Sequence, residues 1–287
     1  MFGNACDGAY SSVNVRFTKD CDNNCAFCVE RNGLSSLGRP NPEKITQAII
    51  DSGIKDVLIL GGEPFLYVDE LLTCCRLIRP HVDAIRITTA LPKIFSTHID
   101  PRLEEIFSLI DGLNVSIHSI VHDENMRAFG AKFQHDRLDC IEELNRFIPM
   151  KVRVSLTLSK GAIDSRGALV DAVAVLLRIG CMSIKINELQ NAPDHYVSYE
   201  RIMEIRMPSP YAYGCQTQVT HFDHVAFNPC TIIVKRSCFL VEPSANPTIM
   251  DVVKCARKRW FKCPKNAFAV VYEDGSSCNR WLQMSKG

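Results

Sequence analysis

Short runs of aliphatic and β-branched residues recur along the first two thirds of the chain, and amphipathic segments separate them. Runs with the length and composition of strands occupy residues 13–17, 56–61, 84–90, 113–119, 151–158 and 182–189. Between them, apolar residues at helical spacing predict helices over residues 43–53, 69–78, 101–110, 135–147 and 166–180. Asn41 and Pro42 stand where the first helix begins, and Gly53 and Gly180 stand where helices end.

Strands that alternate with single helices pair in parallel through right-handed crossovers. Six such strands are fewer than a closed eight-stranded barrel requires. The pattern therefore predicts an α/β fold, a partial (β/α)6 parallel TIM-like barrel, with its core over residues 1–190.

The alternation stops near residue 190, where prolines, aromatic residues and scattered cysteines take over. We expect residues 191–287 to form a cysteine-rich C-terminal extension. Within it, residues 225–228, 231–235 and 267–272 are predicted strands, and residues 249–260 are a predicted helix.

The charges are balanced, with 33 Lys and Arg against 32 Asp and Glu, so no nucleic-acid partner and no anionic membrane is expected. No apolar run is long enough to span a bilayer, and residues 1–10 lack the basic start and apolar stretch of a signal peptide. The 14 cysteines then favour reduced thiols and metal ligands over disulfides, and we expect a cytoplasmic protein.

Three cysteines, Cys21, Cys25 and Cys28, directly follow the first predicted strand. Their loop would lie at the carboxyl end of the sheet, where α/β folds place their chemistry. Structural zinc sites take four ligands, whereas three thiolates supply three corners of an iron-sulfur cubane and leave one iron open. A zinc or iron clip that only holds the loop, or three unligated cysteines, remain as alternatives.

This spacing of three and then two residues, with Phe27 just before the third cysteine, resembles the radical S-adenosylmethionine (SAM) superfamily. The resemblance implies a four-iron four-sulfur (4Fe-4S) cluster on the three cysteines, with SAM on its open iron. One electron would then cleave SAM to a 5′-deoxyadenosyl radical, which abstracts hydrogen from a substrate in a biosynthetic reaction. It also implies an electron donor of the flavodoxin or ferredoxin type.

A second motif, Gly61, Gly62, Glu63 and Pro64, closes the second predicted strand and resembles the turn that the same family carries there. The resemblance implies that the carbonyls of Gly61 and Gly62 and the Glu63 carboxylate accept hydrogen bonds from the methionine amino group of SAM. Taken alone, the motif is equally compatible with an ordinary turn.

Polar residues on the later strands supply further candidates. The strand around Ser116 resembles that of the molybdenum-cofactor GTP cyclase branch, which implies that Ser116 binds SAM and that His118 replaces an acidic residue. Further cofactor-binding candidates are Thr89, Arg153 and Asn187, and the catalytic candidates are His118, Lys185 and Glu188. These side chains have helix capping or solvation as an alternative role.

The extension carries Cys215, Cys230, Cys238, Cys255, Cys263 and Cys278, which are candidates for an auxiliary iron-sulfur cluster. The GTP cyclase branch and the SPASM-type, peptide-modifying branch hold such clusters in this part of the chain. The spacing here matches neither branch, and buried free cysteine is the alternative.

The sequence predicts a small metabolite or a nucleotide-like molecule as the substrate. Three alternatives stay open: a peptide-modifying radical SAM enzyme, a non-catalytic iron-sulfur electron carrier or sensor, and a zinc-stabilised binding protein.

Overall fold

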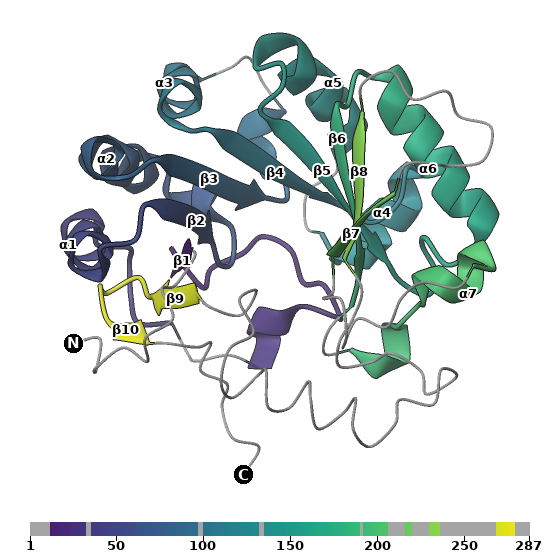
Figure 1. Cartoon of the computed structure of the whole chain (residues 1–287), viewed down its shortest axis with the longest axis horizontal. Helices are drawn as coiled ribbons and strands as arrows, with labels where there is room; N and C mark the ends of the chain where they lie inside the picture. The colour runs from purple at the N-terminus through teal and green to yellow at the C-terminus, as the bar shows by residue number, and fades with distance from the viewer. Residues whose placement is uncertain are drawn as a thin grey trace. The chain divides into compact units, whose positions relative to one another are not determined.

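The computed structural model describes residues 12–32, 36–96, 100–131, 135–189, 192–205, 216–219, 230–235 and 268–278. All six strands predicted for the barrel core are present: β1 (Ser12–Arg16), β2 (Asp56–Leu60), β3 (Ala84–Thr89), β4 (Gly112–Ile117), β5 (Val152–Leu158) and β6 (Ser183–Glu188). The predicted helices are also present: α1 (Pro42–Ser52), α2 (Val68–Ile78), α3 (Pro101–Leu109), α5 (Arg137–Phe147) and α6 (Arg166–Arg178). Figure 1 shows this alternation along the chain.

Several elements differ from the expectation. The helices α4 (His122–Phe129) and α7 (Tyr199–Met203) and the strands β7 (Gln216–Val219) and β10 (Ser277–Cys278) were not predicted. The strands β8 (Thr231–Lys235) and β9 (Phe268–Val271) confirm two expected strands of the extension. The expected strand at 225–228 and the expected helix at 249–260 lie outside the described residues.

Short 3-10 helices complete the list of elements: η1 (Val29–Asn32), η2 (Pro64–Tyr67), η3 (Arg79–His81), η4 (Lys93–Phe95) and η5 (Pro193–His195).

The helix ends follow the local sequence signals. The Asn41 side chain accepts a hydrogen bond from the Lys44 amide at 2.9 Å, which satisfies a free amide in the first turn of α1. Gly53 ends α1 in the left-handed conformation, at φ 68°. The structure therefore confirms both boundaries that the sequence predicted for this helix.

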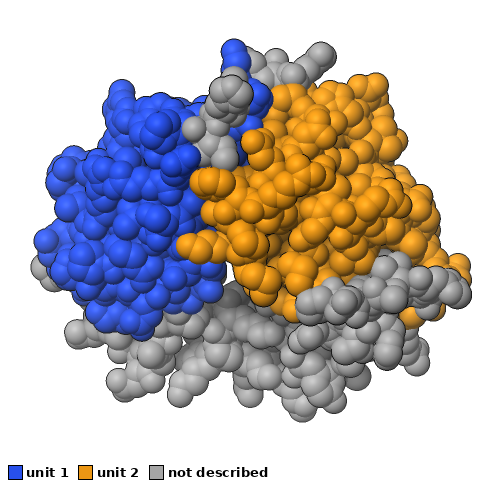
Figure 2. All heavy atoms as spheres, turned by 90° about the horizontal axis from the view of Figure 1, so that it is seen from above, with its two compact units in different colours: residues 1–22, 30–114, 262–287 blue, residues 23–29, 115–261 orange. Residues whose placement is uncertain are grey.

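The chain divides into two compact units (Figure 2). The first contains residues 1–22, 30–114 and 262–287, and the second contains residues 23–29 and 115–261. The described parts of the C-terminal extension are therefore shared between the units, β9 and β10 falling in the first and β7 and β8 in the second. The boundary between the units runs through β4.

The sheet of the first unit has the order β10-β9-β1-β2-β3. β9 runs parallel to β1, and β2 and β3 continue the parallel order. The buried Arg16 guanidinium on β1 donates to both Glu273 carboxylate oxygens, at 3.0 and 3.1 Å, just beyond β9. A two-bond contact of this kind fixes geometry as well as charge, so the ion pair holds the end of the extension to β1.

The sheet of the second unit has the order β5-β6-β8-β7, with β5, β6 and β8 parallel and β7 antiparallel. Alternate residues of β5 and β6 are buried, such as Val154, Leu156, Ile184 and Ile186, and the residues between them are half-buried. This two-residue period places the apolar and the polar positions on opposite faces of the sheet.

Among the described residues, no helix combines the length and the apolar character that crossing a membrane requires.

Candidate functional site

The three cysteines of the predicted cluster motif are accessible thiols on the loop after β1. Cys21 and Cys28 are exposed and Cys25 is half-buried. The Cys28 amide donates to the Cys25 carbonyl at 3.2 Å, which closes a turn between the second and third thiols. Cys21 belongs to the first unit, and Cys25 and Cys28 belong to the second. Within the described ranges, no three His, Cys, Asp or Glu side chains are already grouped to hold an ion.

Four other cysteines differ from this triplet in burial. Burial raises the pKa of Cys74 and Cys181 to about 12 and that of Cys140 to about 11, and it raises the pKa of Cys75 well above its ordinary value. A thiol must lose its proton to bind a metal. These four cysteines are therefore core residues and not metal ligands, in the way that buried free cysteine commonly behaves.

The second half of the cysteine loop is fastened to its own unit by backbone and side-chain contacts. The Asn24 amide donates to the Phe129 carbonyl at 2.8 Å, at the end of α4. Arg137, which is buried at the start of α5, donates to the Asn23 side chain at 3.2 Å. The next residue after Phe129 is Gly130, where a Cβ atom would lie 2.8 Å from the Asn24 carbonyl oxygen. Only glycine permits this close approach.

The Phe27 ring lies between two histidines that follow strands. Its centroid is 4.9 Å from that of His118, edge to face, and 6.0 Å from that of His195. His118 directly follows β4, and His195 ends η5, which follows β6. Phe27 therefore lies beyond the carboxyl ends of these strands, where the sequence placed the cysteine loop.

His118 is buried and packs by its ring. Its centroid is 4.2 Å from that of Phe129, and its own backbone amide donates to the Asn125 side chain at 2.9 Å. Burial, helped by the nearby Arg137 cation, lowers the pKa of His118 to about 3, so the ring is neutral near pH 7. Its Nδ1 atom has no hydrogen-bond partner in the described structure. A base this weak does not take up a proton at neutral pH.

The Gly-Gly-Glu-Pro turn contacts the start of the cysteine loop through its backbone. The Gly62 amide donates to the Thr18 carbonyl at 2.6 Å, and the Glu63 amide donates to the Asp20 carbonyl at 2.8 Å. A Cβ atom at Gly62 would lie 2.0 Å from the Asp20 oxygen, and Gly61 has φ 137°. Both glycines are therefore required by the close approach of two backbone segments. Pro64 is the first residue of η2, where a missing amide hydrogen costs little.

The Glu63 carboxylate accepts hydrogen bonds from its own unit. Its Oε1 accepts from the Thr89 hydroxyl at 2.9 Å and from the Phe65 amide at 3.2 Å, and Oε2 accepts from the Ala90 amide at 2.7 Å. The side chain is completely buried, and burial raises its pKa to about 7 against the lowering effect of these three bonds. Glu63 therefore links the turn after β2 to the end of β3, and Thr89 supports Glu63.

The remaining candidates separate into an accessible and a buried group. Ser116, Arg153, Lys185 and Asn187 are half-buried on the polar faces of β4, β5 and β6. In contrast, the Glu188 carboxylate is buried and accepts from the Tyr199 amide at 2.8 Å and the Tyr196 hydroxyl at 3.1 Å. Glu188 thus fixes the segment after β6, a role that an alternating pattern alone does not reveal.

The candidate auxiliary-cluster cysteines are mostly outside the described structure, namely Cys215, Cys238, Cys255 and Cys263. Cys278 is described only as part of the β10 backbone. Cys230 is half-buried and directly precedes β8, which pairs in parallel with β6. It therefore lies at the amino edge of this sheet, whereas Phe27 and His195 lie beyond the carboxyl edge.

The donor set fits an iron-sulfur cluster better than a closed zinc site. Three accessible thiols share one loop, and thiolates are the ligands of such clusters. The other cysteines whose side chains the structure describes are buried or, in the case of Cys230, lie at the amino edge of the sheet. The family model of the radical SAM superfamily matches residues 15–162, more than half of the chain. The chain belongs to the radical SAM superfamily. Members of this superfamily carry a 4Fe-4S cluster and use SAM, so the match confirms the cofactors that the sequence predicted.

Two kinds of curated relatives are similar to parts of this radical SAM chain. A probable GTP 3′,8-cyclase of Pyrococcus abyssi is 26% identical over 148 residues, which are 50% of this chain and 47% of the cyclase. L-lysine 2,3-aminomutase of Bacillus subtilis is 33% identical over 97 residues, 31% of this chain and 21% of the aminomutase. The chain thus spans about half the length of the cyclase and less of the aminomutase.

Solved structures support the fold. SuiB of Streptococcus suis matches with a TM-score of 0.59 at 15% identity, over 95% of this chain and 60% of SuiB. A radical SAM methyltransferase from Sphaerobacter thermophilus matches with a TM-score of 0.52 at 15% identity, over 67% of this chain and 60% of the methyltransferase. These similarities confirm the predicted α/β, partial-barrel fold class.

The sequence did not reveal the groups that fasten the cysteine loop. Phe129 and Arg137 lie more than 100 residues after the loop, and no local sequence pattern links either residue to it. Gly130 is the one local signal in this region, because a glycine at this position indicates the end of a helix, here α4.

Proposed function

We propose that Cys21, Cys25 and Cys28 hold the 4Fe-4S cluster, and that the enzyme uses SAM to remove a hydrogen atom from a small metabolite or nucleotide-like substrate. The observation that carries this proposal is the pairing of the accessible thiols with the Gly-Gly-Glu-Pro turn. Two backbone hydrogen bonds join that turn to the residues just before Cys21. A structural zinc site or an electron carrier would not require the Gly-Gly-Glu-Pro turn beside the cysteine loop.

When bound, the reduced cluster supplies one electron that splits SAM into methionine and a 5′-deoxyadenosyl radical, which takes a hydrogen atom from the substrate. The electron comes from an external donor, for which we propose a protein of the flavodoxin or ferredoxin type. The work of this chain is to position the reactants and to keep water from a reactive radical.

The described residues divide this work. The Cys25 to Cys28 turn and the Phe27 ring, packed on His118, present two of the three thiols. The Gly62 and Glu63 amides fix the backbone before the remaining thiol, Cys21. We assign SAM binding to the Gly61 and Gly62 carbonyls and to Ser116, Arg153 and Asn187, which are half-buried rather than packed in the core.

The proposed substrate class rests on polarity and on the partial similarity to a GTP cyclase. Half-buried hydroxyl, amide and cationic groups share one face of β5 and β6, and a face lined in this way suits a polar ligand. A peptide substrate is the alternative, and it predicts modification of peptides by the reconstituted enzyme.

Anaerobic reconstitution followed by dithionite and SAM tests the proposal. We expect the wild type to release 5′-deoxyadenosine and Cys25→Ala to release about a hundredfold less, because the cluster loses one of its three ligands. Cys140→Ala is the matched control, since this thiol is buried in α5, and it should retain activity. Equal nucleoside release by wild type and Cys25→Ala would overturn the proposal.

Iron and sulfide counts on a variant with all three loop cysteines changed to alanine test the extension. Any cluster that remains must use the late cysteines, for which we propose a set that excludes Cys230 because of its place at the amino edge of β8.

A further inference from the structure

Glu273, in the turn that joins β9 to β10, contacts both ends of the segment that carries the three thiols. This segment, residues 17–41, runs from the end of β1 to the start of α1. The Glu273 carboxylate accepts from Nε and Nη2 of Arg16, at 3.0 and 3.1 Å. Its Oε1 also accepts from the Leu37 amide at 2.8 Å, and its backbone carbonyl accepts from the Asn41 amide at 2.8 Å. One residue of the extension therefore bonds the chain just before the cysteine loop and again after it.

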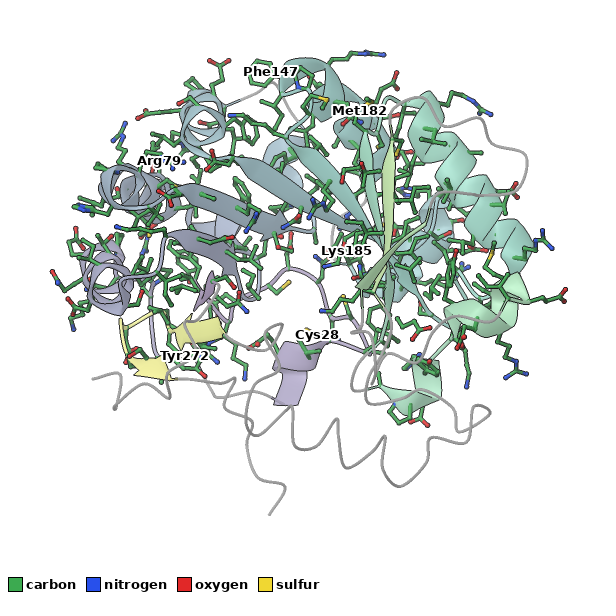
Figure 3. All side chains as sticks on the ribbon, in the orientation of Figure 1. Cys28, Arg79, Phe147, Met182, Lys185 and Tyr272 are labelled. Atoms are coloured by element: carbon green, nitrogen blue, oxygen red, sulfur yellow. The ribbon has the colours of Figure 1, made fainter. Side chains whose placement is uncertain are left out.

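These contacts lie within the first unit and are shielded from water. Glu273 is 0% exposed and Arg16 is 1% exposed. The Tyr272 ring covers the guanidinium of Arg16, with the guanidinium carbon 4.6 Å from the ring centroid. Figure 3 shows Tyr272 at the turn between β9 and β10. Charge-assisted hydrogen bonds are strong and directional in such a dry environment, so they resist movement of the groups that they join.

The turn that presents Glu273 is itself held against α1. The Gly275 amide donates to the Tyr272 carbonyl at 2.9 Å, and the Tyr272 amide donates to the Ser276 carbonyl at 2.9 Å. A Cβ atom at Gly275 would lie 2.6 Å from the Cβ atom of Lys44 on α1. This close approach requires glycine and leaves the turn little room to shift.

The Arg16 guanidinium also meets a carboxylate from inside the cysteine segment. Glu30, in η1 two positions after Cys28, is buried, and its Oε2 lies 3.7 Å from Nη1 of Arg16. That separation is longer than a hydrogen bond, so the pair is a looser ionic contact than the one with Glu273. Glu273 therefore determines where the guanidinium lies, and the guanidinium in turn contacts η1.

We propose that Glu273 is a positioning residue for the cluster. Its bonds to Arg16, Leu37 and Asn41 hold the two ends of the cysteine segment in place, so that the loop is arranged before the cluster and SAM bind. The inference rests on the proposed function, since it takes the cluster to lie on the loop between these bonded residues. It gives the end of the extension a role in the reaction that needs no cysteine ligand there.

The first measurement uses the full wild-type chain before its cluster is loaded. Hydrogen exchange, resolved to single residues, compares the Leu37 amide, which donates to Glu273, with the Gly38 amide, which donates to the exposed Ser36 hydroxyl. We expect the Leu37 amide to exchange about a hundredfold more slowly, because its exchange requires the buried contact to open. Equal exchange of the two amides would overturn the proposal, because the loop would not be arranged before the cluster binds.

The second measurement uses a double variant, Arg16→Met with Glu273→Leu, reconstituted with its cluster. Apolar residues of similar size commonly replace a buried ion pair without loss of stability, so this variant removes the hydrogen bonds and keeps the packing. The electron paramagnetic resonance spectrum of the dithionite-reduced cluster, titrated with SAM, reports binding at the open iron. We expect the variant to need about tenfold more SAM than the wild type for the same spectral change. A variant that melts as the wild type does but holds less iron would also support the proposal.

Arg76→Met with Glu105→Leu is the matched control. Arg76 donates to both Glu105 carboxylate oxygens at 2.5 and 2.6 Å, between α2 and α3 of the same unit, and both side chains are exposed. This variant should bind iron and SAM as the wild type does. The role of Glu273 is rejected if the Arg16 and Glu273 double variant melts, binds iron and responds to SAM as the wild type does.

The same titration separates this inference from the proposed function. A wild type that shows no spectral change with SAM rejects the proposed function, whatever the exchange rate of the Leu37 amide. A wild-type change that the Arg16 and Glu273 double variant shares in full rejects only the role of Glu273.

Discussion

Glu63 and His118 are both buried titratable residues just past the end of a strand, one in each unit, and their surroundings are opposite. The Glu63 carboxylate accepts three hydrogen bonds, from Phe65, Thr89 and Ala90. The Nδ1 atom of His118 has no partner among the described residues, and its ring packs on Phe27 and Phe129. Glu63 is therefore held by its polar atoms, and His118 is held by its ring.

Burial opposes the charged form of both side chains, so it moves their pKa values in opposite directions. The pKa of Glu63 rises to about 7, and the pKa of His118 falls to about 3. The folded protein thus retains a proton on Glu63 that the unfolded chain releases above about pH 4.5. It excludes from His118 a proton that the unfolded chain binds below about pH 6.5.

The contribution of Glu63 to stability is complete below about pH 4.5 and is lost as the pH rises to about 7. The contribution of His118 is complete above about pH 6.5 and is lost as the pH falls toward about 3. Between about pH 4.5 and 6.5 the two slopes cancel. Any effect of ligand binding at these two residues adds to this pH dependence, which comes mainly from burial.

The largest effect is expected from Gly62→Ala, which attacks the turn that carries Glu63. The added Cβ atom would lie 2.0 Å from the Asp20 carbonyl oxygen, and neither backbone segment is a flexible end that can move aside. We expect the free energy of unfolding of the cluster-free protein to fall by about 3 kcal/mol, measured by urea titration.

Gly167→Ala is the control for this change. Gly167 lies in the first turn of α6, where a Cβ atom would meet nothing within 4 Å. Alanine should stabilise that helix by about 0.5 to 1 kcal/mol. An equal response of the two glycine variants would mean that the turn after β2 tolerates a side chain.

Glu63→Gln is expected to have an intermediate effect. The amide keeps the shape but presents hydrogen atoms to at least one backbone amide that now donates to the carboxylate, which costs about 1 to 3 kcal/mol at pH 4.5. As the pH rises from about 4.5 to 7, the variant should recover relative to the wild type by up to about 1.4 kcal/mol per pH unit. Urea titrations at several pH values measure this slope.

Glu104→Gln makes the same chemical change on the exposed side of α3 and provides the baseline. A Glu63→Gln curve parallel to that of the wild type between pH 4.5 and 7 would show that the carboxyl is not protonated in the folded protein.

The sequence predicted most of the strands and helices because their apolar periods are local. The helix α4 was not predicted, because only Asn125 and Phe129 of its eight residues are buried and the segment has no apolar period. The pairing of β9 with β1 joins residues about 250 positions apart, as the Arg16 to Glu273 ion pair does, and parallel pairing leaves no local signal.

The candidate site shows the same limit. The spacing of Cys21, Cys25 and Cys28 and the Gly-Gly-Glu-Pro motif are local, and the sequence identified both. The use of each polar group depends on tertiary neighbours. Glu188 turned out to be committed to Tyr196 and Tyr199, and Arg137 turned out to fasten the cysteine loop through Asn23.

His118→Phe should have the smallest effect at neutral pH and would sharpen the contrast with Glu63. Phenylalanine keeps the ring that packs on Phe27 and removes the unpaired Nδ1 atom, so stability at pH 7.5 should change by less than about 1 kcal/mol. Below about pH 6.5, the variant should gain on the wild type by up to about 1.4 kcal/mol per pH unit.

The comparison with His118→Ala separates the ring from the nitrogen, because alanine leaves a cavity under Phe27 and should cost about 2 to 4 kcal/mol at pH 7.5. Below about pH 6.5 this cost should shrink with the same slope as for His118→Phe, since both variants lack the imidazole. If His118 acts only through packing, His118→Phe retains release of 5′-deoxyadenosine from SAM while His118→Ala loses both stability and cluster. If His118→Phe instead keeps its iron and its stability but no longer releases the nucleoside, the Nδ1 atom of His118 binds a ligand in the wild type. Glu63 would then be a structural group and His118 a functional one.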